Sequence, residues 1–188
     1  NVKIDSFFKD KSNLIKNMLT NFFVKKIRND KSDDFNLKVI RKKSLDKEAY
    51  VLEINTKSIE ISSSDISGVR HAIQSLRQIK YFNKNKSSRL PLVKIEDSPR
   101  FSYRGFMLDI SRHFYPKDKI IEVLDILSLL KLNYFELRLT DDEGWRIEIP
   151  GLPELTTVGA NRGYTVNERD KLIPAYGSGA HGRKNGNG

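Results

Sequence analysis

Two polar clusters stand at the ends of two apolar segments in the second half of the chain. The apolar segments, residues 106–110 and 134–139, have the length and composition of short buried strands. The two clusters consist of Asp109, Arg112, His113, Asp141, Asp142 and Glu143. In parallel α/β architectures, functional groups gather at the carboxyl ends of the strands. We therefore expect these side chains to lie side by side on one rim.

The residue types in these clusters suit the recognition of a polar ligand such as a sugar. The guanidinium of Arg112 offers a planar fork of donors, which matches paired hydroxyls or a carboxylate. An aspartate on the same rim can orient a histidine or accept hydrogen bonds from hydroxyls. Trp145, just beyond the second cluster, offers an apolar ring face against which a sugar could lie.

Each of these residues also has a purely structural interpretation. Asp109 could pair with Arg112 and stiffen the end of its strand, and residues 141–143 could form an ordinary acidic turn. His113 and Trp145 could be packing residues. The sequence has no histidine and aspartate spacing of a dedicated metal site, no G-x-S-x-G motif and no phosphate-binding glycine loop. We expect neither a metal ion nor a cofactor.

The segment between the two apolar strands predicts a helix. Pro116 suits a helix start, and an apolar stripe at helical spacing then continues to Lys131. Strand, helix and strand form a βαβ unit, whose strands run parallel with a right-handed crossover. Residues 106–110 are nearly all apolar, which predicts a strand buried on both faces. Residues 141–163 follow as a long connection.

The first half of the chain predicts a small sheet with helices packed on one side. Apolar residues at helical spacing predict helices at residues 11–27 and from Ile66 onward, the second one after the capping oxygens of residues 62–65. Alternating apolar and polar residues predict the strands, and residues 82–90 predict a polar loop. The predicted strands are residues 35–39, 50–54, 59–61 and 92–95.

Composition excludes some classes of protein. The 188 residues include no cysteine, so disulfides and thiolate metal sites are excluded. No stretch approaches the roughly 18 apolar residues of a membrane-spanning helix. The chain does not begin with methionine and shows no signal core, so we expect a processed or cut piece.

The net charge of +10 is concentrated in the first half of the chain. Residues 1–97 carry 21 Lys and Arg against 12 Asp and Glu, whereas residues 98–188 carry 13 against 12. This basic half could bind a polyanion, but it lacks the aromatic residues interleaved with basic ones that stack on bases. A lysine-rich, solvated surface that favours solubility is the simpler interpretation.

Several ordered motifs resemble family 20 glycoside hydrolases, the β-N-acetylhexosaminidases. Residues 98–114, SPRFSYRGFMLDISRHF, resemble the opening of that family's barrel. Residues 68–78, GVRHAIQSLRQ, more loosely resemble the helix that closes its N-terminal domain. The motifs that follow in the family's order are KLN at 131–133, LTDDEGWR at 139–146, LPELT at 152–156 and VGA at 158–160.

The resemblance implies an α/β fold of two parts. Residues 1–97 would be the small N-terminal α/β domain, and residues 98–188 the first βα units of a (β/α)8 TIM barrel. It also implies an exo-acting hydrolase that removes terminal N-acetylglucosamine or N-acetylgalactosamine with retention, the substrate's own acetamido oxygen acting as nucleophile. An Asp–Glu pair orients the acetamide and supplies the general acid and base. That pair belongs to the fourth barrel strand, so we expect it to be missing from this chain and the chain alone to be inactive.

Two roles carry over to residues of this sequence. Arg112 matches the arginine that holds the hydroxyls at positions 3 and 4 of the terminal sugar. Asp141 matches an aspartate that supports the general acid through a histidine on a later strand. Asp109 and His113 match positions around the arginine. The implied partner is an oligosaccharide or glycoconjugate with a terminal N-acetylhexosamine, in an extracellular, periplasmic or lysosome-like location, and we expect no nucleic acid partner.

One stretch departs from the family pattern. Many members have two histidines flanking a tryptophan before the Asp-Asp pair, where this chain has Glu136, Leu137 and Arg138. Glu136 and Arg138 share a strand face and could pair, so with Trp145 they are candidates for the pocket wall. Two alternatives stay open: a non-catalytic amino-sugar-binding relative, and a basic polyanion-binding module.

Overall fold

The computed structural model describes residues 2–23, 36–83, 90–142, 144–163 and 171–172. The chain divides into two compact units. Unit 1 comprises Asn1–Ser102 together with Ser128–Lys131, and unit 2 comprises Tyr103–Leu127 and Leu132–Gly188. The sequence placed a domain boundary after residue 97. The compact units separate after Ser102, and one short later segment returns to unit 1.

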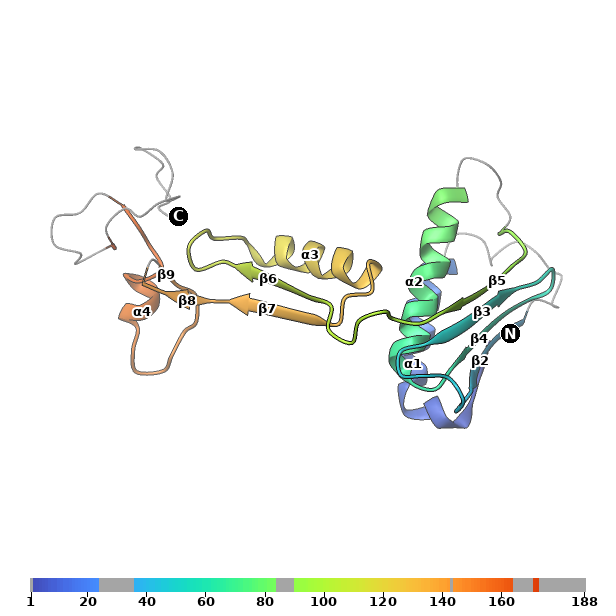
Figure 1. The fold of residues 1–188 in the computed structure, drawn as a ribbon. Helices are drawn as coiled ribbons and strands as arrows, with labels where there is room; N and C mark the ends of the chain where they lie inside the picture. Colours follow the sequence, from blue (N-terminus) through green and yellow to red (C-terminus); the bar gives the residue numbers. More distant parts are fainter. Residues whose placement is uncertain (1, 24–35, 84–89, 143, 164–170, 173–188) are drawn as a thin grey trace. The chain divides into compact units, whose positions relative to one another are not determined.

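Unit 1 is built on a five-stranded sheet with the order β1-β2-β4-β3-β5 (Figure 1). Its strands are β1 (Val2–Ile4), β2 (Asn36–Arg41), β3 (Tyr50–Ile54), β4 (Ser58–Ser63) and β5 (Val93–Asp97). β1 and β4 run parallel to β2, whereas β3 runs antiparallel to both β4 and β5. The sequence did not predict β1, because three residues are too few for an alternating pattern to show.

One face of this sheet forms the core together with two helices, α1 (Ser12–Phe23) and α2 (Ile66–Asn83). The alternation expected in β4 is present, since Ile59 and Ile61 have no exposed surface while Glu60 between them is partly exposed. The apolar stripe of α2, which packs on them, consists of Val69, Ala72, Ile73 and Leu76. The predicted arrangement of a small sheet with helices on one side therefore agrees with the structure.

The predicted helix bounds differ from the structure at several ends. A short 3-10 helix, η1 (Ser6–Lys11), precedes α1, and residues 24–27 of the predicted first helix lie outside the described residues. α2 continues to Asn83, into the segment predicted as a loop, and its first turn lies close to Ala49 at Gly68. A side chain at Gly68 would place its Cβ 2.3 Å from the Ala49 carbonyl oxygen.

The opposite face of the sheet carries charges of both signs. Lys38 of β2 lies 4.0 Å from Glu60 of β4, and Lys94 of β5 lies 3.9 Å from Glu53 of β3. Lys94 also pairs with Glu96 at 2.6 Å. Such exposed pairs contribute little to stability. They do show that lysines of the basic half are interspersed with carboxylates on this face.

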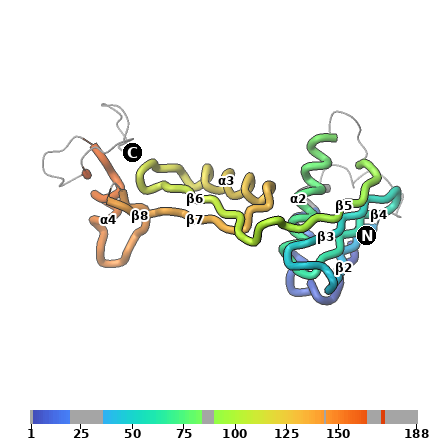
Figure 2. The backbone as a smooth tube through the Cα atoms, in the orientation of Figure 1, coloured from blue at the N-terminus to red at the C-terminus, as the bar shows by residue number. Residues whose placement is uncertain are grey.

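Unit 2 contains the predicted strand–helix–strand arrangement (Figures 1 and 2). β6 (Gly105–Asp109) and β7 (Tyr134–Arg138) pair in parallel, and α3 (Lys117–Leu129) lies along them. Pro116 stands at the helix start as predicted, where its carbonyl accepts from the amides of Lys119 and Ile120.

Two expectations about this arrangement were wrong. β6 is not buried on both faces, since Phe106 and Met107 point to opposite faces and are 41% and 49% exposed. Within the described residues β6 has one strand neighbour, β7, so much of its apolar surface is uncovered. The helix also ends at Leu129 and not at Lys131, whose φ of 61° is left-handed and cannot continue a helix.

Beyond β7 the chain forms a tight antiparallel pair, β8 (Thr140–Asp141) with β9 (Gly144–Trp145). A single helical turn, α4 (Glu154–Thr157), follows. The predicted long connection is therefore partly ordered into elements. Among the helices of the described residues, none is long and apolar enough to cross a membrane.

Candidate functional site

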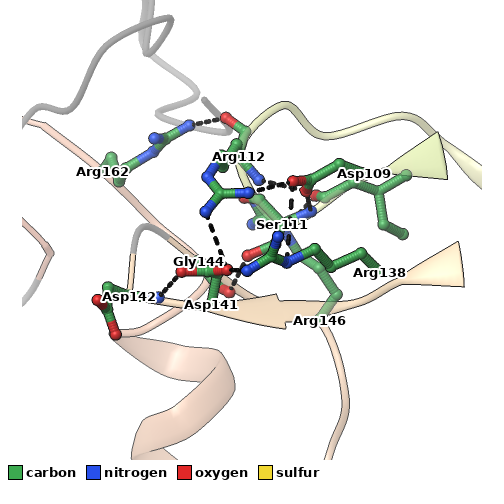
Figure 3. Close-up of polar contacts among 10 residues, drawn as sticks. Asp109, Ser111, Arg112, Arg138, Asp141, Asp142, Gly144, Arg146 and Arg162 are labelled. Carbon is green, nitrogen blue, oxygen red and sulfur yellow. Dashed lines mark hydrogen bonds and ion pairs between the residues drawn. The ribbon is translucent and has the colours of Figure 1, made fainter. Parts of the chain in front are cut away.

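The loop after β6 is organised by one carboxylate, that of Asp109 (Figure 3). Its Oδ1 accepts from the backbone N–H groups of Ser111 at 2.9 Å and Arg112 at 3.0 Å. Its Oδ2 accepts from Nη1 of Arg112 at 2.6 Å. Aspartate is suited to this position because its short side chain reaches backbone donors two and three residues ahead. The carboxylate therefore fixes both the loop backbone and the Arg112 side chain.

Asp141 receives the other side of the Arg112 guanidinium. Nη2 of Arg112 lies 3.1 Å from Asp141 Oδ2, and Nη2 of Arg138 contacts the same oxygen. The other carboxylate oxygen accepts from the N–H of Asp142 at 2.8 Å. Nε of Arg138 lies 4.0 Å from Asp109 Oδ2, which closes a ring of alternating charges. This four-charge cluster consists of Asp109, Arg112, Asp141 and Arg138 (Figure 3).

The four-charge cluster exposes its cations more than its anions. The side chains of Arg112 and Arg138 are 43% and 42% exposed, whereas those of Asp109 and Asp141 are 19% and 12% exposed. The two arginine side chains are therefore more accessible to solvent than the two carboxylates that they contact. Such a surface can donate to the oxygen atoms of a bound ligand while the aspartates hold the donors in place.

The pKa of Asp109 is below its usual value. Partial burial on its own raises this pKa, because it disfavours the charged carboxylate. The hydrogen bonds from Arg112 and from the Ser111 amide, together with the positive charge of Arg112, outweigh burial and lower the pKa. Asp109 is therefore ionised near neutral pH and acts as an acceptor, not as a proton donor.

Two further arginines, Arg146 and Arg162, hold the backbone of the same loop (Figure 3). Arg146 donates to the carbonyl oxygens of Ile110 at 3.0 Å, Ser111 at 2.9 Å and Ala160 at 2.6 Å. The Nη2 of Arg162 donates to the Arg112 carbonyl. Burial lowers the pKa of Arg146, and the nearby positive charge of Arg162 lowers it further.

The Ser111 side chain joins this loop to the β8–β9 pair. Its hydroxyl donates to the Gly144 carbonyl at 2.5 Å, and the residue has no exposed surface. A Cβ on Gly144 would lie 2.4 Å from the Ser111 carbonyl oxygen, so a glycine is needed for this close approach.

The other predicted site residues do not take part in the cluster. His113 is exposed, and its ring lies 5.1 Å from that of Tyr115. Trp145 donates from Nε1 to the Ile147 carbonyl at 2.7 Å and is partly buried. Asp142 is exposed, and Glu143 lies outside the described residues.

The pairing of Glu136 with Arg138, which the sequence allowed, is not formed in the structure. The two residues do share a face of β7, but the Arg138 guanidinium turns to Asp141 and Asp109. The reason is the parallel register, which places Asp109 beside Arg138. Two carboxylates at the strand ends therefore attract the guanidinium more strongly than one exposed Glu136 does.

Sequence reasoning missed the support that Arg146, Arg162 and Ser111 give to the loop. Arg146 lies within the LTDDEGWR motif, and that position was the available signal. For Arg162 the sequence held no signal, because its partner is a backbone carbonyl that is 50 residues away. Within the described part of the chain, no group of three metal-binding side chains comes together.

Two family models match the chain. The model described as glycosyl hydrolase family 20, domain 2, matches residues 8–98. The model described as glycosyl hydrolase family 20, catalytic domain, matches residues 101–181. The chain belongs to glycosyl hydrolase family 20. The resemblance seen in the motifs is therefore confirmed, and it extends over both units of this family 20 chain.

Named relatives agree with this family. An N,N'-diacetylchitobiase of Vibrio harveyi is 46% identical over 131 residues, which are 70% of this chain and 15% of the relative. A β-hexosaminidase of Vibrio vulnificus is 40% identical over 140 residues, which are 74% of this chain and 16% of the relative. The family 20 chain therefore spans about a sixth of the length of these relatives.

A solved structure shares the fold. The exo-β-N-acetylglucosaminidase of Vibrio harveyi in complex with N-acetylglucosamine has a TM-score of 0.73 and 33% identity to this chain. The match covers 94% of this chain and 27% of that one. The α/β fold class of the family 20 chain is thereby supported.

Proposed function

We propose that the protein containing this chain is an exo-β-N-acetylhexosaminidase, which removes terminal N-acetylglucosamine or N-acetylgalactosamine from oligosaccharides or glycoconjugates. One observation carries the proposal. In a family 20 chain, the Arg112 guanidinium is held between Asp109 and Asp141 at the ends of adjacent parallel strands, and the Arg112 side chain is 43% exposed. The arrangement suits recognition of two neighbouring sugar hydroxyls, those at positions 3 and 4.

The same proposal includes the barrel. β6, α3 and β7 are the first βα units of a (β/α)8 barrel, and further strands would pair with the open edges of the two-stranded sheet. The large exposed apolar surface of unit 2 supports this, because a soluble domain rarely leaves so much uncovered. The exposed residues include Phe106, Met107, Ile121, Leu124, Ile126 and Tyr134.

The reaction would be retaining and substrate-assisted. The acetamido oxygen of the substrate attacks the anomeric carbon, the bond to the leaving oxygen breaks, and a general acid gives that oxygen its proton. Water then attacks the oxazolinium, and the same residue takes the water's proton as general base. The acid and its aspartate partner are expected on a later strand. This chain contributes the hydroxyl-binding Arg112 and the supporting Asp141.

The supporting role of Asp141 is constrained by its partners. Arg112 and Arg138 share one of its oxygens, and the N–H of Asp142 uses the other. Each carboxylate oxygen has two acceptor positions, so a position on the Asp142 side stays available for a histidine donor. Arg138 adds a permanent positive charge beside that contact.

The test measures hydrolysis of 4-nitrophenyl N-acetyl-β-glucosaminide and galactosaminide by the complete protein that contains this chain. We expect turnover, and a loss of about 100-fold in kcat/KM for Arg112→Lys, because lysine cannot form the two-pronged contact. Lys117→Arg, on the exposed start of α3, is a matched control that should leave the rate unchanged.

Two outcomes separate the alternatives. Binding of N-acetylglucosamine without turnover by the complete protein would contradict the hydrolase and favour the amino-sugar-binding relative. The 188-residue chain alone should bind weakly and turn nothing over. Hydrolysis by this chain alone would mean that its own residues supply the acid, and the assignment of roles would be wrong.

A further inference from the structure

The three residues of the loop after β6, Ile110 to Arg112, have every backbone polar group paired. The N–H of Ile110 donates to the Arg138 carbonyl at 3.0 Å, and the next two N–H groups donate to Asp109. Arg146 donates to the carbonyls of Ile110 and Ser111, and Arg162 donates to that of Arg112. All six backbone N–H and C=O groups of residues 110–112 are therefore fixed by side chains or by β7.

Such complete pairing is unusual for a connecting segment. Loops ordinarily satisfy much of their backbone with water and are accordingly mobile. Here the three carbonyl oxygens of the loop accept from two guanidiniums, those of Arg146 and Arg162. The site is also buried, since Ile110, Ser111 and Arg162 are 4%, 0% and 3% exposed. A planar group with several fixed N–H directions can bind carbonyls of different segments at once, which a lysine ammonium on its flexible stem does not reproduce.

Of the two loop arginines, Arg146 and Arg162, Arg146 also connects the loop to neighbouring segments. A third donor of Arg146 reaches the Ala160 carbonyl, while the Arg146 N–H donates to the Leu139 carbonyl at 2.9 Å, next to β8. Through Arg146, the loop that carries Arg112 is therefore connected to Leu139, which precedes Asp141 in the chain, and to Ala160, which follows it.

We propose that Arg146 and Arg162 are positioning residues for Arg112. They do not touch the ligand; they fix the carbonyls of residues 110–112, so that the Arg112 guanidinium stays between Asp109 and Asp141. The effect on substrate choice rests on the proposed function, because it requires that Arg112 binds the sugar at position 4. The effect on the loop does not depend on the proposed function.

The first experiment measures hydrogen exchange in the 188-residue chain for Arg146→Lys and Arg162→Lys, with the exposed Arg70→Lys as control. We expect the Ser111 and Arg112 amides to exchange about 10-fold faster or more in both loop variants, and not in the control. Amides of the β6–β7 ladder, such as that of Leu108, should keep their rates.

That comparison separates positioning from general stability. If both variants merely destabilise the fold, the β6–β7 amides will accelerate with the loop amides in both, and the proposal is wrong. Unchanged exchange at Ser111 and Arg112 would also overturn it. Arg162→Lys guards against a misfolded Arg146→Lys, since each arginine binds a different carbonyl.

The second experiment uses the complete protein and the two 4-nitrophenyl substrates, whose sugars differ in configuration at carbon 4. We expect each loop variant to lower kcat/KM by about 10- to 100-fold. The preference between the two sugars should also shrink, because a loosened Arg112 discriminates less at that carbon. A loss of activity with the preference unchanged would contradict positioning. If the wild-type protein hydrolyses neither substrate, the proposed function fails, and hydrogen exchange alone decides whether the arginines fix the loop.

Discussion

Nη1 of Arg112 lies 2.6 Å from Oδ2 of Asp109, three residues earlier in the chain. The same carboxylate accepts from two backbone amides of the loop that carries Arg112. One aspartate thus fixes both the path of the chain and the direction of the side chain. The structural interpretation of Asp109 and the binding interpretation of Arg112 are therefore compatible, although the sequence presented them as alternatives.

The first prediction concerns Asp109→Asn. Asparagine keeps one oxygen for the loop amides but faces Arg112 with an NH2 group, which replaces an attraction by two opposed donors. We expect kcat/KM of the complete protein to fall by about 10- to 100-fold, mainly through a higher KM. The exposed Asp142→Asn is the matched control and should have no effect. Equal kinetics for the two variants would show that the Asp109 charge is not needed.

A second prediction follows from Lys131, which belongs to unit 1. Its Nζ donates to Asp97 Oδ2 at 2.7 Å and to the hydroxyl of buried Tyr50 at 2.9 Å, and its backbone is left-handed at φ 61°. Lys131→Met should destabilise unit 1 by about 1 to 2 kcal/mol, a value reduced for the partly exposed pair.

Lys131→Gly separates charge from backbone in that prediction. Glycine also removes the ammonium but accepts positive φ without a steric cost, so we expect it to be about 0.5 to 1 kcal/mol less damaging than methionine. Urea unfolding followed by exchange of the β3 and β4 amides gives both values. If glycine is as damaging as methionine or more so, backbone strain at Lys131 is not significant.

The third prediction concerns acid pH and Asp97. Burial raises the pKa of this carboxyl, but hydrogen bonds from Lys131 and Tyr50 lower it below the ordinary 3.8. A lowered folded-state pKa stabilises the fold above the unfolded-state value, and this contribution is lost as pH falls through the folded-state pKa. The stability difference between wild type and Asp97→Asn should therefore be full near about pH 6 and shrink below about pH 4. A difference that stays constant over this range would contradict the pKa direction.

The fourth prediction concerns the basic first half of the chain. On the sheet face described in unit 1, Lys38 and Lys94 alternate with carboxylates, so the field there is mixed. We expect no retardation of a short DNA duplex even at about 50 mM salt, where phosphate contacts are strong. A basic DNA-binding domain serves as positive control. A shift that disappears steeply with added salt would instead support the polyanion-binding alternative.

The elements that carry the site could be predicted because their patterns are local. The stripe of α3 and the apolar runs of β6 and β7 each show within about 15 residues, and parallel pairing then brings Asp109 near Asp141. The family motifs then indicated that Arg112 and Asp141 belong to the site. The functional roles assigned to Arg112 and Asp141 stay predictions.

What could not be predicted depends on partners far away in the sequence. Arg138 was matched with Glu136 on its own strand, whereas its partners come from the ends of two other strands. Arg162 binds a carbonyl that any residue at position 112 would supply. The left-handed Lys131 is stabilised by Asp97 and Tyr50, which no helix pattern reveals.

The last prediction concerns Gly144→Ala. The added methyl group would lie 2.4 Å from the Ser111 carbonyl oxygen, so the loop that carries Arg112 must move away from β9. We expect unit 2 to lose about 1 to 3 kcal/mol of stability. Gly163→Ala is the matched control, since its Cβ would lie 3.0 Å from Cδ of the flexible Lys171 side chain. Trp145 is the sole tryptophan of the chain, so its fluorescence during urea unfolding reports on unit 2. If the two alanine variants unfold at the same urea concentration, the close approach of Gly144 to Ser111 does not constrain the loop.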